Sequence, residues 1–450
     1  MSAAGPGSAS LHVGTLVYTR RRLGALFVWL LWGDFAWQLK ERAAIPVAQL
    51  MLKRFGASDF LLSLLVGSLP AAMGMLVGPA VGVRSDRHRG RRGRRIPFLL
   101  FSTPFVVAGM VGLAFAPQLG AVLDTALGVH TLGPAVCRLI AFAAAWSLFE
   151  IFTIIANAVF GGLINDVVPA SLIGRFFGLF RAVSLIAGVV FNFWLIGHAE
   201  EHSQAIFLGI GLLYGAGFML MCLAVKEGEY PPPPPRATGS TFAPLVAYLR
   251  ECFADRYYLW VFAAIMLGNL AGAPVNSFSV LYAKSINMDM SDYGKLLVAT
   301  YVVSFALSFG LGWLADRFHP LRVGIATLGL YAVVMFWGGV AATDTQQFAV
   351  AFIAHGILTG AFFTGTASIG QRLFPAAKFA QFASASGIVG AFGYMVLPPV
   401  IGLTLDHTGH IYRHTFTASG VLAALACLAF AIVYRQLMRR NPAEILSSSS

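Results

Sequence analysis

Long apolar runs alternate with short polar segments along the chain, and this alternation predicts a bundle of membrane-spanning helices. A helix that crosses a bilayer needs about 20 mostly apolar residues. Twelve such runs lie near residues 23–50, 60–83, 96–116, 135–162, 172–197, 204–225, 257–284, 293–315, 321–341, 346–370, 378–404 and 412–435. Glycine and proline within them suit membrane helices, because neighbouring helices pack on small residues and satisfy the backbone at kinks. Twelve spans place both chain ends on the same side of the membrane.

The positions of Lys and Arg predict which side that is. If both termini are cytoplasmic, 22 of these residues fall in inner segments and 6 in outer loops. Because inner loops of membrane proteins are enriched in Lys and Arg, we expect a multi-pass protein of the cell inner (plasma) membrane with cytoplasmic termini. The formal net charge of +12 then reflects orientation and contact with anionic membrane lipid, and no nucleic acid is expected as a partner.

Composition narrows the class of protein further. The chain of 450 residues is 58% hydrophobic, so lipid must be the solvent for most of its surface. Its 4 cysteines have neither a disulfide nor a metal-binding spacing. His407, His410 and His414 have roughly helical spacing, but only Asp406 accompanies them. We therefore expect no metal and no cofactor. The first 20 residues lack the apolar core of a signal peptide.

A proline-rich segment divides the spans into six and six. The stretch "KEGEYPPPPPRATGSTF" (226–242) is incompatible with a helix and indicates an extended tether. Residues 243–256 have the pattern of an amphipathic helix on the inner membrane surface. The predicted domains are an N-terminal tail (1–22), an N-terminal six-helix bundle (23–225), a cytoplasmic linker (226–256), a C-terminal six-helix bundle (257–435) and a C-terminal tail (436–450).

The two halves repeat each other weakly. Residues 82–87 (GVRSDR) match 312–317 (GWLADR), and the segment 169–176 resembles 375–382. The two offsets differ by about 24 residues, which places an insertion in the outer segment around 117–134. Repeated halves joined by a linker predict a transporter whose site lies between two pseudo-symmetric bundles.

The stretch "GVRSDRHRGRRGRR" (82–95) resembles the loop signature of the major facilitator superfamily, and its form is most similar to the glycoside–pentoside–hexuronide:cation symporters and sucrose carriers. The resemblance implies an all-α integral membrane fold, with twelve transmembrane helices in two pseudo-symmetric six-helix bundles. It also implies a cytoplasmic gate. The gate residues by resemblance are Gly82, Asp86, Arg87, Gly93 and Arg94, with Asp316 and Arg317 in the second half.

The chemistry of the loop supports a latch. Arginine forms forked bonds to carboxylates and can bond helix-terminal carbonyls, so several arginines can clamp the inner faces of the bundles shut. In the alternative, these arginines only orient the chain and contact lipid phosphate. Orientation alone would not need Asp86 or Gly82.

Ionisable residues at membrane depth are the main candidates for a site, because each is costly there unless paired or hydrated. Asp34 lies midway along the first span. One helical face joins it to Trp37, Gln38 and Glu41. Nearer the outer end we expect water-facing structural pairing of Lys40, Glu41 and Arg42.

The fourth span carries Glu150, with Trp146 one turn before it and Asn157 two turns after it, and the fifth carries Arg181. An arginine beside two carboxylates can keep one ionised and leave the other to exchange a proton. The alternative is a static cluster of Asp34, Arg181 and Glu150 that only holds helices together.

The melibiose-type carriers resemble this arrangement, and in them such residues bind sugar hydroxyls while the tryptophan stacks on the ring. Carried over, the sugar-binding residues are Asp34, Trp146, Glu150 and Arg181. The second span, however, has no carboxylate where sodium-using members keep a pair. We therefore expect coupling to protons through Asp34 or Glu150, not to sodium.

The C-terminal half offers uncharged polar groups at comparable depth, among them Asn269, Asn276 and His355, which suit a polyol. His355 either titrates or makes a satisfied contact between helices. The predicted function is proton-coupled import of a neutral sugar or glycoside by a monomer, with sucrose as the specific guess. The alternative is proton-coupled efflux of drugs or amphipathic metabolites. No nucleophile–base pair, metal cluster or phosphate loop indicates an enzyme.

Overall fold

The computed structural model describes residues 11–127, 132–232, 248, 250–375 and 378–440, with the side chains of 305, 308–309, 311–316 and 380 excepted. In chain order the helices are α1 (Arg20–Arg54), α2 (Asp59–Ser63), η1 (Leu64–Ser68), α3 (Leu69–Arg87), α4 (Ile96–Ala114), α5 (Ala116–Ala126), α6 (Pro134–Val167), η2 (Ala170–Leu172), α7 (Ile173–Val190), η3 (Phe191–Leu195), η4 (Ile196–His198), α8 (Ser203–Ala224), α10 (Arg256–Leu270), α11 (Ala273–Ser285), α12 (Met290–Arg317), α13 (Pro320–Ala341), α14 (Thr345–Gly365), α15 (Ile369–Leu373), α16 (Phe379–His407) and α17 (His414–Arg440). The described strands β1 (Leu11–Val13) and β2 (Leu16–Tyr18) pair antiparallel.

The prediction of an all-α membrane fold is confirmed. Ten segments of the described chain, from Asp59–Arg87 to His414–Arg440, are long and apolar enough to span a membrane. Two further long helices, α1 and α12, coincide with the predicted first and eighth spans. The predicted amphipathic helix at 243–256 lies largely outside the described residues, although residues 250–253 are helical.

The chain divides into two compact units. The first contains residues 1–57 and 73–236, and the second contains residues 58–72 and 237–450. The second unit thus includes α2, η1 and the start of α3, which come from the N-terminal half of the sequence.

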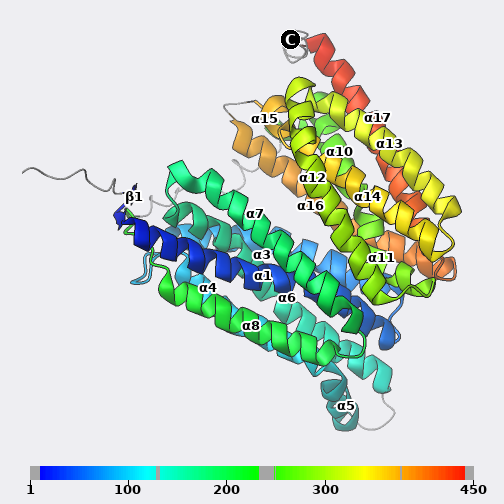
Figure 1. The fold of residues 1–450 in the computed structure, drawn as a ribbon, viewed down its shortest axis with the longest axis horizontal. Coiled ribbons are helices and arrows are strands. Elements are labelled where there is room, and N and C mark those ends of the chain that lie inside the picture. The colour runs from blue at the N-terminus through cyan, green and yellow to red at the C-terminus, as the bar shows by residue number, and fades with distance from the viewer. Residues whose placement is uncertain (1–10, 128–131, 233–247, 249, 376–377, 441–450) are drawn as a thin grey trace, which may run out of the picture. The chain divides into compact units, whose positions relative to one another are not determined.

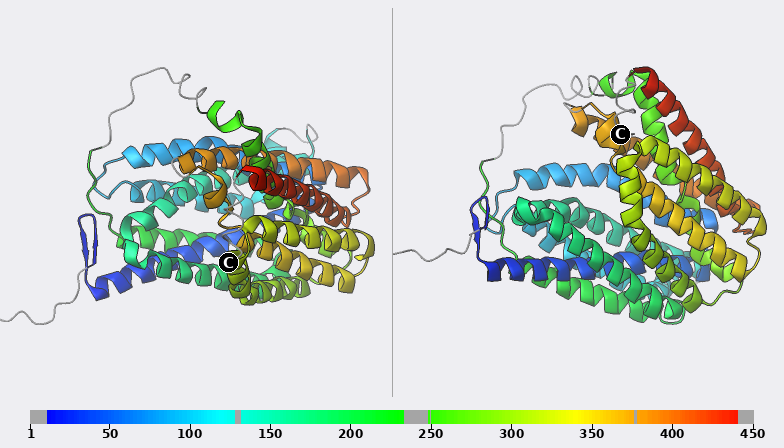
Figure 2. Two further views of the ribbon diagram at one scale, coloured as in Figure 1. Left: turned by 90° about the horizontal axis from the view of Figure 1, so that it is seen from above. Right: turned by 45° about the horizontal axis from the view of Figure 1, so that its top comes forward.

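In the first unit, α1 packs against α7 and α8, and α4 packs against α6 and α8 (Figure 1). Aromatic rings fill the space between these helices, with Trp37 of α1 beside Phe160, Tyr214 and Phe218. The hairpin β1–β2 lies beside the start of α1, and α5 lies at the opposite end of this unit (Figures 1 and 2). Helix α5 occupies the region of the predicted insertion.

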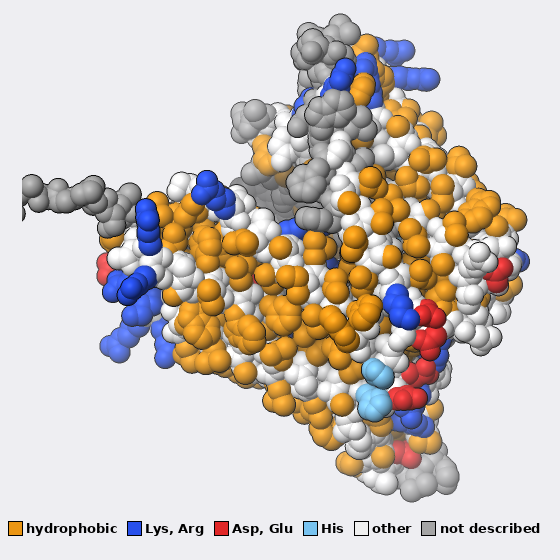
Figure 3. Space-filling view, viewed as in Figure 1, with side chains coloured by type: hydrophobic (Ala, Val, Ile, Leu, Met, Phe, Trp, Pro, Cys, Tyr) orange, Lys and Arg blue, Asp and Glu red, His pale blue; other side chains and the backbone are white. Residues whose placement is uncertain are grey.

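The outer flanks of the first unit are apolar, as expected for surfaces that face lipid. Basic side chains gather at the end that carries the hairpin, while hydrophobic side chains cover the helices behind it (Figure 3). We call this end, with Arg20–Arg22 and the loop 88–95, the basic end of the first unit.

In the second unit, α17 packs against α13 and α10, and α14 packs against α12 and α13. The segment α2–η1 packs along α16, and Gly402 allows the closest approach. A Cβ atom at residue 402 would lie 2.4 Å from the carbonyl oxygen of Asp59, so any side chain there would separate the two helices. Further along, the hydroxyl of Ser68 donates to the carbonyl of Met395 at 2.5 Å.

Candidate functional site

Arg95 is the centre of a bonded network at the basic end of the first unit. Its side chain is buried, and its guanidinium donates to Ser85 Oγ at 2.5 Å, to the carboxylate of Asp86 and to Asp166 Oδ2 at 3.2 Å. Three acceptors for one guanidinium fix the end of α3, the loop after it and the end of α6 in one arrangement. The motif loop is therefore a structured contact between helices.

Asp166, near the end of α6, also binds Arg94. Nε and Nη2 of Arg94 donate to the two carboxylate oxygens at 2.8 and 2.5 Å, which is a forked ion pair. This pair raises the pKa of the Arg94 guanidinium further above its ordinary value. Asp166 was not among the residues expected from the sequence, although its position just before the segment 169–176, which resembles 375–382, could have indicated it.

The segment after α8 is also bonded to this loop. Glu227 Oε2 accepts the backbone N–H of Arg94 at 2.9 Å, and Oε1 accepts those of Arg95 and Ile96 at 2.8 and 2.7 Å. A carboxylate at the start of a helix satisfies backbone N–H groups that have no partner within the helix and also favours the helix dipole. Glu227 therefore caps α4 from a segment 131 residues away.

Tyr230 completes this contact. Its hydroxyl donates to Glu227 Oε2 at 2.8 Å, and the guanidinium of Arg94 lies 4.3 Å from the centre of its ring. Burial, followed by the nearby Glu227 carboxylate, raises the pKa of Tyr230 above its ordinary value. The beginning of the predicted tether is thus a bonded strap on the arginine loop.

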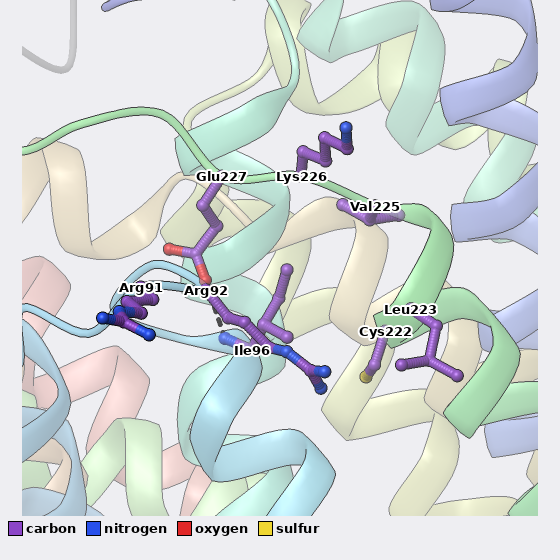
Figure 4. Close-up of a pocket in the computed structure, with 8 residues that line it drawn as sticks. All are labelled: Arg91, Arg92, Ile96, Cys222, Leu223, Val225, Lys226 and Glu227. Atoms are coloured by element: carbon purple, nitrogen blue, oxygen red, sulfur yellow. Dashed lines mark hydrogen bonds between the residues drawn. The ribbon is translucent and has the colours of Figure 1, made fainter.

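A cavity of about 400 Å³ opens beside the strap. Arg91, Arg92, Lys226 and Glu227 supply its polar lining, and Leu223 lies on the apolar side (Figure 4). In Figure 4 the Glu227 carboxylate points toward the start of α4 and is bonded to the backbone of Ile96. Three cationic side chains around one carboxylate, itself committed to the helix cap, leave this cavity positively charged.

The predicted gate residues have different roles in the structure. Gly82 accepts the Ser85 hydroxyl at its carbonyl, and Asp86 pairs with Arg95. Gly93 has φ +98°, and a Cβ there would lie 2.5 Å from Glu227, so a side chain would displace the strap. Arg87 ends α3 and takes no part in the bonds described around Arg95. In the second unit, Arg317 is exposed at the end of α12, and the side chain of Asp316 lies outside the described residues.

Asp34 is completely buried in the middle of the first unit. Gln38 Nε2 donates to Asp34 Oδ1 at 3.1 Å, and the Ser184 hydroxyl of α7 donates to Gln38 Oε1 at 3.1 Å. Its Oδ2 has no hydrogen-bond partner among the described residues. A carboxyl group so placed is costly for stability alone.

Lys40 is paired with Glu41, as expected, but the expectation that its side chain faces water was wrong. Helix α1 continues to Arg54, so Lys40 lies near its middle, and its side chain is 0% exposed. The ammonium forms an ion pair with Glu41 Oε1 at 2.6 Å. Glu150 of α6 is close enough to interact electrostatically with both.

The hypothetical cluster of Asp34, Glu150 and Arg181 is not formed in this structure. Asp34 bonds to Gln38, Glu150 lies near the Lys40–Glu41 pair, and Arg181 is exposed on α7 and absent from the described contacts of either carboxylate. Sequence spacing places each residue at its depth along a helix, but helix rotation decides which side chains meet.

The remaining candidates of the first unit fall into two groups. Trp146 is 0% exposed, stacked on Phe142 and tilted against Phe149, and Trp37 lies in the aromatic core. Neither ring offers an open face for a sugar in this state. Asn157, by contrast, is exposed on α6.

His355 was expected either to titrate or to make a hydrogen-bonded contact between helices, and the structure shows the hydrogen-bonded contact. Its Nδ1 lies 2.7 Å from the Tyr331 hydroxyl, and its Nε2 lies 3.0 Å from Asn276 Oδ1. The amide of Asn276 is itself exposed on α11. Asn269 is half-buried, and its backbone carbonyl accepts a hydrogen bond from the Tyr394 hydroxyl at 3.0 Å.

A second polar cluster joins α2 to α16. Asp406 and His410 were noted together in the sequence, whereas their partner Asp59 was not. Asp406 accepts the backbone N–H groups of Asp59 and Phe60 at 2.8 and 2.9 Å. The Asp59 carboxylate in turn accepts from His410 Nδ1 at 2.6 Å and the Tyr412 hydroxyl at 3.1 Å. Asp59, Asp406 and His410 present donor atoms within 4.8 Å of one another, a geometry compatible with a metal. These atoms already bond to one another, to Tyr412 and to the start of α2, so the cluster functions as a helix cap.

Long apolar helices, repeated halves and charged networks at helix ends define a class of protein, the secondary transporters. The model of the MFS/sugar transport protein family matches residues 51–379. The chain therefore belongs to this family of the major facilitator superfamily, as the loop signature indicated. No protein among those with curated functions matches the sequence.

Solved structures of transporters have the same fold. A bacterial homologue of the human lysosomal transporter Spinster, inward-facing and unoccupied, is similar over 96% of this chain and 99% of its own, with 13% identity and a TM-score of 0.70. A D-xylose–proton symporter is similar over 91% of this chain and 96% of its own, with 14% identity and a TM-score of 0.59. A peptide transporter of the POT family, in complex with sulfate, covers 97% and 98%, with 13% identity and a TM-score of 0.65. These similarities show the fold.

Proposed function

We propose that this multi-pass membrane transporter imports a neutral sugar or glycoside together with protons by alternating access. The observation that carries the proposal is the Asp34 carboxyl group, fully buried with one described hydrogen bond. Because a buried carboxyl group is costly unless it has a task, a proton-carrying role explains its presence. Glu150 is the second candidate for this role.

The choice of protons as the coupling ion is supported by the absence of carboxylates from the predicted second span. Its residues 60–83 include no carboxylate, so a sodium site of the melibiose type is not available there. The family description covers sugar transport, and a structural neighbour is a D-xylose–proton symporter. Sucrose remains the specific guess.

The gate of this transporter is proposed to be the network around Arg95. Breaking it requires Asp166 and Glu227 to give up charged hydrogen bonds together, which makes the contact two-state. We place the basic end in the cytoplasm, since loops rich in Lys and Arg remain inside. The protein then has cytoplasmic termini in the inner membrane and acts as a monomer.

The proposal is tested with a lightly buffered suspension of cells that express the protein, to which single glycosides are added. Import with protons makes the medium more alkaline, and Asp34→Asn and Glu150→Gln abolish this response. If no glycoside changes the pH while tolerance to lipophilic cations rises, the protein is an exporter. The aromatic-rich first span, with Phe27, Trp29 and Trp32, would suit that second function.

A further inference from the structure

Lys40 occupies an aromatic cage at the middle of the first unit. Its Nζ lies 3.9 Å from the centre of the Trp37 ring, 5.2 Å from that of Phe149 and 5.3 Å from that of Tyr214. These rings come from α1, α6 and α8. An ammonium over aromatic faces within about 6 Å is stabilised by their quadrupoles, more strongly where water is excluded.

The position of Lys40 along α1 places the cage far from either end of this helix. Lys40 follows Arg20 by 20 residues and precedes Arg54 by 14. At 1.5 Å per residue these separations are about 30 Å and about 21 Å. A lysine side chain cannot extend to either helix end over such distances, so its charge must be compensated locally.

Two oxygens provide that compensation. Nζ donates to Glu41 Oε1 at 2.6 Å and to Thr153 Oγ1 of α6 at 3.3 Å. Adjacent residues of a helix do not normally face each other. The pairing of Lys40 with Glu41 therefore depends on the cage, which holds the ammonium where the carboxylate can reach it.

Glu150 brings a second carboxylate to the same cation. It precedes Thr153 by three residues and so lies on the same face of α6, and it interacts electrostatically with Glu41 and Lys40. Two carboxylates and one ammonium carry a net charge of −1, and one added proton makes the group neutral. The Glu41 side chain is 40% exposed, so it is the member that water reaches.

We propose that Lys40 is the positioning residue of a proton site in which Glu41 and Glu150 share one exchangeable proton. On uptake, a proton from water adds to a carboxylate oxygen at Glu41 or Glu150, and on release the O–H bond breaks and the proton returns to water. Lys40 stays charged in the cage throughout. The inference rests on the proposed proton-coupled transport and defines the site around Glu150, its second candidate carrier beside Asp34.

The first test needs no substrate. Infrared pH-difference spectra of the purified, reconstituted protein report protonated carboxyl groups directly. In an Asp34→Asn background, which removes the other candidate carboxyl group, we expect a carboxyl band that titrates and that is lost when Glu41→Gln and Glu150→Gln are added. In Lys40→Met the midpoint of this band moves to higher pH by at least about one unit, because the cation no longer stabilises the ionised form. An unchanged midpoint in Lys40→Met overturns the inference.

The second test separates coupling from transport in vesicles. It uses the glycoside that changes the pH in the cell assay, in which sucrose is tried first. Exchange of labelled for unlabelled glycoside needs binding and alternating access, whereas accumulation needs the proton gradient. We expect Lys40→Met to keep exchange within about threefold of wild type and to lose at least about tenfold in accumulation. Lys295→Met, which removes an exposed lysine paired with Asp292, should leave both unchanged.

If Lys40→Met does not fold, the double variant Lys40→Met/Glu41→Gln replaces the test. It removes both members of the Lys40–Glu41 pair and keeps the net charge of the group at −1, now on Glu150 alone, which proteins tolerate better than loss of one partner. Wild-type accumulation in either variant overturns the role of Lys40 while leaving proton-coupled transport standing. Failure of the wild-type protein to accumulate any glycoside under a proton gradient contradicts the proposed function itself, and the infrared titration still decides whether the proton site exists.

Discussion

Glu227 holds the start of α4 through Ile96: its Oε1 lies 2.7 Å from the backbone nitrogen of that residue. The glutamate follows the sixth predicted span, and the helix it caps is the third. The segment predicted as an extended tether is therefore bonded, at its beginning, to the arginine loop. Its charge links the cap of α4 to the network around Arg95.

The first prediction concerns this cap. A glutamine has one acceptor oxygen, whereas the Glu227 carboxylate uses both, so Glu227→Gln must lose bonds to backbone N–H groups and to Tyr230. Loss of a helix cap typically costs about 1 kcal/mol. We expect a lower melting temperature for the purified protein. The matched control is Glu229→Gln, because Glu229 is exposed; equal melting temperatures for the two variants would refute the capping role.

The second prediction concerns Asp166, the shared acceptor of Arg94 and Arg95. Asp166→Asn leaves Arg94 without its carboxylate and Arg95 with Asp86 alone, and should reduce glycoside transport at least about tenfold with normal membrane insertion. Because the residues act as a unit, adding Arg94→Gln should cost little more. Asp292→Asn, an exposed carboxylate of α12, is the control. Additive losses in the double variant would show that the pair is not a functional unit.

The third prediction concerns the cluster of Asp59, Asp406 and His410. Because Asp406 caps α2, Asp406→Ala should lower the melting temperature by the equivalent of about 1 kcal/mol. Removal of divalent metals with EDTA should change neither stability nor transport, since the donor atoms already bond to one another and to the start of α2. A fall in melting temperature on EDTA treatment that Asp59→Asn abolishes would instead identify a metal site.

The fourth prediction is a pH dependence that arises from His319, between α12 and α13. Burial, together with Arg372 and Arg322, lowers the pKa of this histidine from 6.5 to about 4. The histidine of the unfolded chain binds a proton more readily than the buried His319. The contribution of neutral His319 to the stability of the fold is therefore complete above about pH 6.5. It is lost progressively as the pH falls toward 4. His319→Gln should flatten the melting-temperature profile over this range, whereas the exposed His407→Gln should not.

The fold followed from the sequence because its signals are local. Apolar length sets the spans, and the repeated motif at 82–87 and 312–317 indicates two related halves. The helices extend beyond the apolar runs, as α1 does to Arg54, because charged residues continue a helix as readily as apolar ones. This extension moved Lys40 from an expected surface position to the middle of the unit.

The site was less predictable, since its bonds join residues far apart in the chain. Gly82, Asp86 and Arg94 belong to a recognisable motif, whereas Asp166 and Glu227 are single carboxylates with no local pattern. Likewise, position along the predicted spans placed Asp34 and Glu150 well inside long helices, and Asp34 is completely buried. Helix rotation, which packing determines, brought Lys40 instead of Arg181 to Glu150.

Movement of a glycoside together with protons is measurable in proteoliposomes that enclose a pH-sensitive dye. When a glycoside is added outside, we expect the lumen to become more acidic at a rate that rises with glycoside concentration, with no response in Glu150→Gln. If every glycoside leaves the pH of the lumen unchanged, while a lipophilic cation drives protons out of it, the protein is an exporter and does not import glycosides.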